Sequence, residues 1–171
     1  MPLIRARLIE AAEWWVLVAT VAVTPLVFSR WTFDVFNITE VTVLWIGMTI
    51  AVGLRLSRVM SGDWPRIPAI WPYVLAYVGV FALTTSTSRA PVVSLMGNYG
   101  RLGGMVTLVP AVLVAWLLSD EMSKRPHRRR QLLAAIALSS TVGAMYLIAQ
   151  QLDLDTYTWL QFGGREPTHP P

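Results

Sequence analysis

Five apolar stretches follow one another along the chain, and short polar segments separate them. The hydrocarbon core of a bilayer is about 30 Å thick and a helix rises about 1.5 Å per residue, so one crossing needs about 20 mostly apolar residues. The pattern therefore predicts an all-α, polytopic membrane bundle in which residues 1–171 form a single helical region. Its expected transmembrane helices are residues 14–28, 35–56, 69–87, 102–118 and 131–152, followed by a tail at 153–171.

Turn lengths and prolines refine this picture. Only a few residues separate the first two spans, so we expect them to form an antiparallel hairpin. Pro25 should bend or end the first helix, whereas Pro72 falls in the first turn of the third helix, where a missing N–H costs little. Pro110 lies inside the fourth span and predicts a kink there.

The fifth span carries small residues at four-residue spacing: Ala135, Ser139 and Gly143. This spacing places them on one face of a helix, and small side chains allow another helix to approach closely in lipid. We therefore expect this face to contact a neighbouring helix.

Lysine and arginine are concentrated in alternate polar segments. Ten lie in the amino-terminal segment and in the second and fourth loops: Arg5, Arg7, Arg55, Arg58, Arg66, Lys124, Arg125, Arg128, Arg129 and Arg130. The opposite side carries four: Arg30, Arg89, Arg101 and Arg165. Because cytoplasmic loops are enriched in these residues, we predict a cytoplasmic amino terminus and an extracytoplasmic tail. The basic run from Lys124 to Arg130 is interpreted as a cytoplasmic stop and a lipid-contact patch.

Composition narrows the possible classes of protein. Hydrophobic residues make up 54% of the chain and charged residues 14%, far fewer charges than in ordinary soluble domains. The net charge is +4, but the basic residues lie at helix ends rather than on a soluble basic face. We expect membrane lipids as partners and no nucleic acid.

Few residue types suited to metal binding or hydrolysis are present. The chain has no cysteine, and His127 and His169 fall on opposite sides of the predicted membrane. They could not share a metal ion, and no Ser-His-Asp arrangement can be assembled from the outer residues. The sequence indicates no metal site and no cofactor.

Glu40 lies within the second predicted span. A carboxylate inside a membrane is a functional candidate, because an unpaired charge in hydrocarbon is costly. In the structural alternative, the side chain reaches the outer interface or pairs with Arg30 or Arg101.

The loop between the third and fourth spans contains the glycine-rich stretch Gly97-Asn98-Tyr99-Gly100-Arg101-Leu102-Gly103-Gly104. Arg89 and Arg101 add positive charge beside the start of the fourth helix, and helix amino termini and guanidinium groups both favour phosphate oxygens. The lysine and hydroxyl residue of a nucleotide-binding loop are absent. A glycine-rich turn with an interfacial arginine is the structural alternative.

Four local patterns carry a resemblance to a known family: Thr24-Pro25-Leu26, Phe33-Asp34-Val35-Phe36, residues 97–104, and Phe162-Gly163-Gly164-Arg165. In their order and spacing they resemble the amino-terminal part of the O-antigen ligase and O-antigen polymerase superfamily. The resemblance covers the whole chain but only the opening part of the family.

Two departures limit what the resemblance implies. Many relatives have Pro-Lys where this chain has Thr39-Glu40, so any role of that lysine is absent here or reversed in charge. Relatives also continue after a Gly-Arg like Gly164-Arg165 into a Gly-Asn-Pro-Asn segment, further helices and a large outer loop that holds the catalytic base. We therefore expect a fragment of a longer protein, without that base and with no assigned catalytic residue.

For the intact protein, the resemblance implies a bacterial inner-membrane enzyme of cell-surface polysaccharide assembly. It would transfer a glycan from undecaprenyl pyrophosphate to an acceptor hydroxyl on the outer face of the membrane, without a metal. Arg101 and Arg165, followed by Arg89, are the candidates for contacting the pyrophosphate or its lipid carrier. The alternative is a non-catalytic multi-pass membrane scaffold or lipid-binding subunit.

Overall fold

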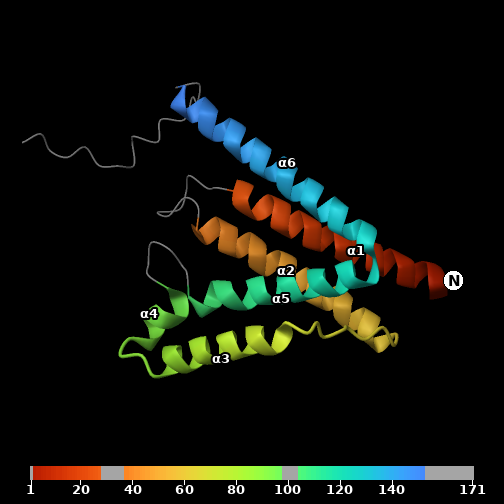
Figure 1. Ribbon diagram of the computed structural model, residues 1–171, viewed down its shortest axis with the longest axis horizontal. Helices are drawn as coiled ribbons and strands as arrows, with labels where there is room; N and C mark the ends of the chain where they lie inside the picture. The colour runs from red at the N-terminus through yellow and green to blue at the C-terminus, as the bar shows by residue number, and fades with distance from the viewer. Residues whose placement is uncertain (1, 28–36, 98–103, 153–171) are drawn as a thin grey trace, which may run out of the picture.

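A computed structural model of the chain describes residues 2–27, 37–97 and 104–152 (Figure 1). Within these ranges the regular elements are all helical, which confirms the predicted all-α class. In chain order they are α1 (Pro2–Val23), the 3₁₀ turn η1 (Thr24–Leu26), α2 (Asn37–Met60), α3 (Trp71–Ser86), α4 (Pro91–Met96), α5 (Met105–Lys124) and α6 (Pro126–Gln151).

Four long helices form the body of the protein. Helix α1 lies at its centre and packs against α2, α5 and α6, and α5 also contacts both α2 and α6. The α1–α2 contact is the most extensive of these, so the predicted hairpin is confirmed. Helix α3 lies at the edge of the group farthest from α6, and its main contact is with the short helix α4 (Figure 1).

The described helices include four that are long and apolar enough to cross a membrane: Ala6–Leu26, Ile38–Met60, Met105–Lys124 and Pro126–Ala149. The sequence predicted five. Helix α3 is the difference, because its 16 residues span only about 24 Å, less than the hydrocarbon core. The chain is a multi-pass membrane protein with one apolar helix shorter than a full crossing.

At one end of the bundle the helices extend beyond the predicted membrane spans. Helix α1 begins at Pro2 rather than at residue 14, α5 ends at Lys124 rather than at 118, and α6 begins at Pro126 rather than at 131. Hydropathy marks where apolar side chains stop, whereas backbone hydrogen bonding continues through charged turns. The expected basic loop is therefore almost entirely helical.

The prolines act largely as predicted. Helix α1 gives way to a 3₁₀ turn containing Pro25, and Pro72 lies in the first turn of α3. Pro110 lies inside α5, which continues through it, and the kink itself stays a prediction. Because proline has no N–H, the Val106 carbonyl four residues earlier loses its helical donor. The Trp45 indole N–H of α2 donates to this oxygen at 2.9 Å.

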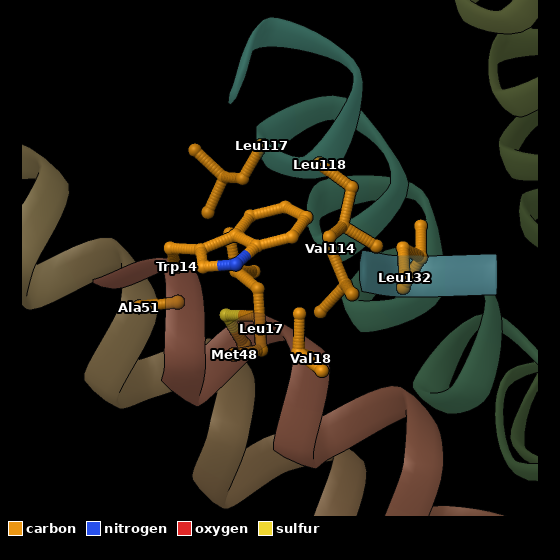
Figure 2. Packing of buried hydrophobic residues seen from close by; sticks show 9 residues of the cluster. All are labelled: Trp14, Leu17, Val18, Met48, Ala51, Val114, Leu117, Leu118 and Leu132. Carbon is orange, nitrogen blue, oxygen red and sulfur yellow. The ribbon is translucent and has the colours of Figure 1, made fainter. Parts of the chain in front are cut away.

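The apolar core lies among the four long helices (Figure 2). Its buried residues are Trp14, Leu17, Val18, Met48, Ala51, Val114, Leu117, Leu118 and Leu132. They come from α1, α2, α5 and α6, so this core fixes the positions of all four helices at the level of Trp14.

Small residues allow the helices on both sides of α1 to approach it. A Cβ on Gly47 would lie 1.9 Å from Thr20 Oγ1, so α2 crosses α1 at a point where only glycine fits. On α6, the Ser139 hydroxyl donates to the Ala22 carbonyl at 2.6 Å, and Gly143 faces Leu26. The predicted narrow face of the fifth span is thus confirmed, and its partner is α1.

Candidate functional site

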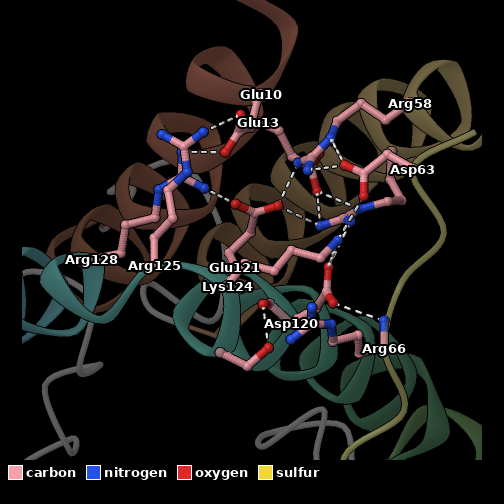
Figure 3. A network of polar contacts seen from close by, with 12 residues as sticks. Glu10, Glu13, Arg58, Asp63, Arg66, Asp120, Glu121, Lys124, Arg125 and Arg128 are labelled. Carbon is pink, nitrogen blue, oxygen red and sulfur yellow. Dashed lines mark hydrogen bonds and ion pairs between the residues drawn. The ribbon is translucent and has the colours of Figure 1, made fainter. Parts of the chain in front are cut away.

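Charged side chains from α1, α2, α5 and α6, with Asp63 from the segment after α2 and Arg125 from the junction of α5 and α6, meet at one end of the bundle (Figure 3). We call this set the charged clamp. It contains five acidic and five basic residues: Glu10, Glu13, Arg55, Arg58, Asp63, Asp120, Glu121, Lys124, Arg125 and Arg128.

Arg55 joins three helices at the centre of the clamp. Its guanidinium lies 2.7 Å from Glu13 Oε1 on α1, 2.7 Å from Asp120 Oδ2 and 2.8 Å from Glu121 Oε1 on α5. The Arg55 side chain is 4% exposed and the three carboxylates are 0% exposed. A planar guanidinium presents several donors in a fixed fork, which suits it to hold three acceptors together.

A second branch continues from Arg58 toward the segment after α2. Arg58 contacts Glu121, lies 2.8 Å from Glu13 Oε2, and donates from Nε to Asp63 at 2.9 Å. Lys124 Nζ donates to Asp63 Oδ1 at 2.9 Å. Partial burial alone would raise the pKa of Asp63, but hydrogen bonds from Lys124 and Arg58 outweigh it and hold that pKa below its ordinary value.

A third branch ties α6 to α1. Arg128 contacts Glu121 and lies 3.0 Å from Glu10 Oε1, while Arg125 donates to Glu10 Oε2 at 2.6 Å. The Arg128 guanidinium also lies 5.2 Å from the centre of the Trp14 ring, a cation–π distance. The polar clamp and the apolar core therefore meet at Trp14.

The chemistry of the clamp is structural. Its formal charges balance, and its buried carboxylates are each held by at least one cation, so none is available as a base. Breaking such a buried pair costs about 3–5 kcal/mol, because the remaining charge is left without a partner in a poorly hydrated site. Among the described residues, no group of three or more His, Cys, Asp or Glu side chains is arranged to hold a metal ion.

The clamp also tests the predicted sidedness of the chain. Its members come from the amino-terminal segment, the region around the second loop and the region around the fourth loop, which the arginine and lysine count assigned to one side. The structure brings these three regions into contact, so their grouping at one end is confirmed. The cytoplasmic identity of this end stays a prediction.

The clamp is absent from the sequence-based predictions, in which Arg55 and Arg58 serve only as orientation signals and Asp120 and Glu121 have no role. The predicted lipid contact of Lys124–Arg130 is wrong for Lys124, Arg125 and Arg128 because they pair with carboxylates. One feature of the sequence could have revealed the clamp: acidic residues lie on the segments that are predicted to share one side of the membrane with these arginines.

Glu40 lies at the opposite end of the bundle, in the first turn of α2, and is half-buried. A carboxylate near a helix amino terminus interacts favourably with the helix dipole. This position is closer to the helix end than the sequence suggested, so it favours the structural alternative. Arg30 and Arg101, the partners considered for it, lie outside the described residues.

Arg89 lies in the bend between α3 and α4 and is exposed. Past α4, Gly97 adopts a φ of +85°, which favours glycine. A Cβ on Gly104 would lie 2.3 Å from the Leu95 carbonyl oxygen and 2.5 Å from the Gly97 nitrogen, so the start of α5 touches the end of α4. Arg101, between these glycines, and Arg165 both lie outside the described residues.

An open apolar groove of about 310 Å³ lies beside this bend, between the last turns of α3, helix α4 and the start of α5. Its lining includes Ala82, Ser86, Val92, Leu95 and Met105. Ser86 and Pro91, on either side of Arg89 in sequence, both line it. One candidate arginine thus lies next to a groove of hydrocarbon character, which is the candidate binding site.

Comparison with family models, curated proteins and solved structures finds no match for this chain. A function is therefore argued from its residues and their geometry.

Proposed function

We propose that this chain is the amino-terminal membrane part of an O-antigen ligase- or polymerase-like glycosyltransferase of the bacterial inner membrane. The intact protein would transfer a glycan from undecaprenyl pyrophosphate to an acceptor during cell-surface polysaccharide assembly. The proposal rests on the resemblance of the four sequence patterns, above all residues 97–104. The multi-pass fold and the orientation predicted from the basic residues are compatible with it.

The reaction makes a defined demand on the protein. An acceptor hydroxyl attacks the anomeric carbon, the bond from that carbon to the pyrophosphate oxygen breaks, and the hydroxyl proton passes to a base. Negative charge grows on the departing pyrophosphate, and guanidinium groups stabilise it through charge-assisted hydrogen bonds. Arg101, Arg165 and Arg89 are the proposed contacts, and the base is expected in the region of the family that follows this one.

One structural observation supports the proposal most. The close contact of Gly104 with Leu95 and Gly97 gives the last glycine of the 97–104 pattern a physical reason, because any larger residue at 104 would collide with backbone atoms. This contact joins the α4 bend that follows Arg89 to the amino terminus of α5, the end of a helix that favours phosphate.

The test is glycan transfer by the complete gene product in proteoliposomes, with a polyprenyl-pyrophosphate-linked glycan as donor. Replacing Arg101 or Arg165 with alanine should lower kcat by about 10²–10³, the usual effect of losing one group that stabilises developing charge. Arg129→Ala, at the other end of the bundle, is the matched control and should retain activity. Unchanged transfer in both Arg101→Ala and Arg165→Ala would overturn the assignment.

The charged clamp favours a second candidate, a non-catalytic scaffold or lipid-binding subunit. The most extensive polar arrangement among the described residues is charge-balanced and serves to hold helices together. If the complete gene product binds the lipid-linked glycan but releases no polyprenyl pyrophosphate, the scaffold is the correct function.

A further inference from the structure

We propose that residues 63–70, the segment between α2 and α3, insert into the lipid head groups at the end of the bundle that carries the charged clamp, and that they complete the membrane crossing of α3. We call these residues the interfacial strap. The partner of its outer face is the lipid surface rather than a second protein. Such a strap requires only that the chain spans a membrane, and it is independent of the proposed glycan transfer.

Helix α3 is too short to cross the hydrocarbon core by itself. Its 16 residues span about 24 Å, which leaves about 6 Å of a core that is about 30 Å thick. The strap precedes it, has no regular secondary structure over residues 63–68, and runs from the end of α2 back along α5 to the start of α3 (Figure 1). An extended chain advances about 3.1–3.4 Å per residue, so about two strap residues supply the missing length. The others then lie at the level of the head groups.

Polar contacts hold the strap against the bundle. Asp63, its first residue, accepts from Arg58 Nε of the clamp at 2.9 Å. Further along, the Arg66 N–H donates to Asp120 Oδ1 at 2.8 Å, and the Arg66 carbonyl accepts from the Trp116 indole N–H at 3.4 Å. The strap therefore has a fixed position beside the last turns of α5.

Two prolines reduce the number of backbone donors that the strap takes out of water. Irregular backbone is costly in lipid, because an unpaired N–H or C=O group loses its hydrogen bonds to water. Pro65 and Pro68 have no N–H, and the N–H of Arg66 between them is paired within the bundle. Each proline also favours an extended conformation in the residue before it, here Trp64 and Ile67. This sequence suits a segment that leaves water without forming a helix.

Exposure along the strap repeats every three residues. Pro65 and Pro68 are partly buried, and Trp71, at the start of α3, is 8% exposed. The large apolar side chains that alternate with them are turned away from the bundle: Trp64 is 72% exposed, Ile67 77% and Ile70 63%. The strap therefore packs one side on the bundle and presents an apolar side outward.

The outer side of the strap is continuous with the lipid-facing surface of α3. Leu75, Tyr77 and Val80 on that helix are exposed, so acyl chains surround them in a bilayer. Tryptophan is typical of the membrane interface, because its ring is apolar and its N–H is a donor, and Trp64 lies where the strap begins. Arg66 is exposed and forms no ion pair within the part of the chain that the structure describes, so its guanidinium can bind lipid phosphates. A basic group, an aromatic ring and then apolar side chains match the layers of a bilayer.

Spin labelling of single cysteines in the 171-residue chain tests the strap, because the natural sequence has no cysteine. The labelled chain is placed in nanodiscs of phosphatidylethanolamine and phosphatidylglycerol. Accessibility to oxygen, which concentrates in lipid, is compared with accessibility to a water-soluble nickel chelate. We expect the oxygen-to-nickel ratio to rise in the order Ser61→Cys, Trp64→Cys, Ile67→Cys and Ile70→Cys. Ser61, exposed in the turn before the strap, is the control for a position in water.

A second label position keeps the three outward apolar side chains in place. Ala69→Cys is exposed on the strap and should also report lipid. Adding Ile67→Asp should raise the nickel accessibility of this label, because a carboxylate resists leaving water, whereas Ile67→Leu should leave it unchanged. Equal nickel accessibility in these two variants would overturn the proposal.

The two reagents also separate lipid from the other possible surroundings of the strap. High oxygen and low nickel accessibility at residues 67 and 70 would support insertion into lipid. Nickel accessibility as high as that of Ser61→Cys would place the strap in water, and low accessibility to both reagents would place it against protein. Either of these last two results would overturn the proposal.

Discussion

Replacing Arg55 with methionine removes the residue at the centre of the charged clamp while keeping a side chain of similar length. Arg55 holds carboxylates on two other helices, at 2.7 Å from Glu13, 2.7 Å from Asp120 and 2.8 Å from Glu121. All three acceptors are fully buried, so water does not replace the lost guanidinium. We expect the polar attachment of α2 to α5 to be weakened to the single contact between Arg58 and Glu121.

The size of the effect follows from the partners that remain. Hydrogen bonds to charged groups contribute about 1.5–3 kcal/mol each, so three would sum to more than 4 kcal/mol if nothing compensated. Arg58 still contacts Glu13 and Glu121, and Lys124 still lies 3.0 Å from Asp120. We therefore expect the lower end of the range for a broken buried pair, about 3 kcal/mol, which is roughly a hundredfold change in the folded-to-unfolded ratio.

The assay is equilibrium unfolding in mixed micelles, followed by tryptophan fluorescence, with the free energy of unfolding compared among variants. Arg129→Met removes an exposed arginine from the same end of the bundle and should change stability by less than 0.5 kcal/mol. Adding Asp120→Asn to Arg55→Met restores charge balance and should recover at least about 1 kcal/mol. A loss below 1 kcal/mol in Arg55→Met would refute the view that the clamp holds these helices together.

Three further predictions address packing, a freed carbonyl and pH. Gly47→Ala should destabilise the fold because its Cβ would collide with Thr20. The control is Gly53→Ala, whose Cβ would have no atom within 4 Å and which should be neutral or raise stability. Thermal unfolding compares the stability of the two variants. Trp45→Phe removes the indole donor to α5 and should cost about 1 kcal/mol in the same assay, and no loss would show that the contact is unimportant. The pKa of Asp63 is lowered in the folded state, so its contribution to stability is present above the ordinary value of about 3.9 and is lost as pH falls through the folded value. Melting temperatures measured from pH 7 to pH 3 should therefore fall less for Asp63→Asn than for the native chain, and identical pH profiles would contradict this.

Much of the fold follows from the sequence because lipid imposes strong constraints. Apolar length identifies the four helices that are long enough to cross the membrane, although it also predicted a crossing at α3, and the distribution of arginine and lysine groups segments by side. The small face of Ala135, Ser139 and Gly143 likewise anticipates a close helix contact, here with α1. These features depend on single segments, so a linear pattern is sufficient to find them.

The clamp depends on information that hydropathy does not carry. Arg55 meets Glu121 only because α2 and α5 are neighbours and because each is rotated to turn its charged residue inward. The helices extend beyond the predicted spans for the same reason. A charged turn at a helix end is interpreted as a loop unless the residues that pair with its charges are known. The groove beside Arg89 requires α4, a helix of six residues that the sequence analysis placed in a loop.

The most direct test of this account is the accessibility of single cysteines on the two sides of the membrane, which the natural absence of cysteine makes simple. Ser61 lies at the clamp end and Thr87 lies beside the Arg89 bend, and both are exposed. In intact bacterial cells, a membrane-impermeant maleimide should label Thr87→Cys, whereas it should label Ser61→Cys only after the cells are opened. Labelling of both positions from the same side, or the reverse pattern, would contradict the account, because Arg89 and its groove would then not lie together on the outer face, opposite the clamp.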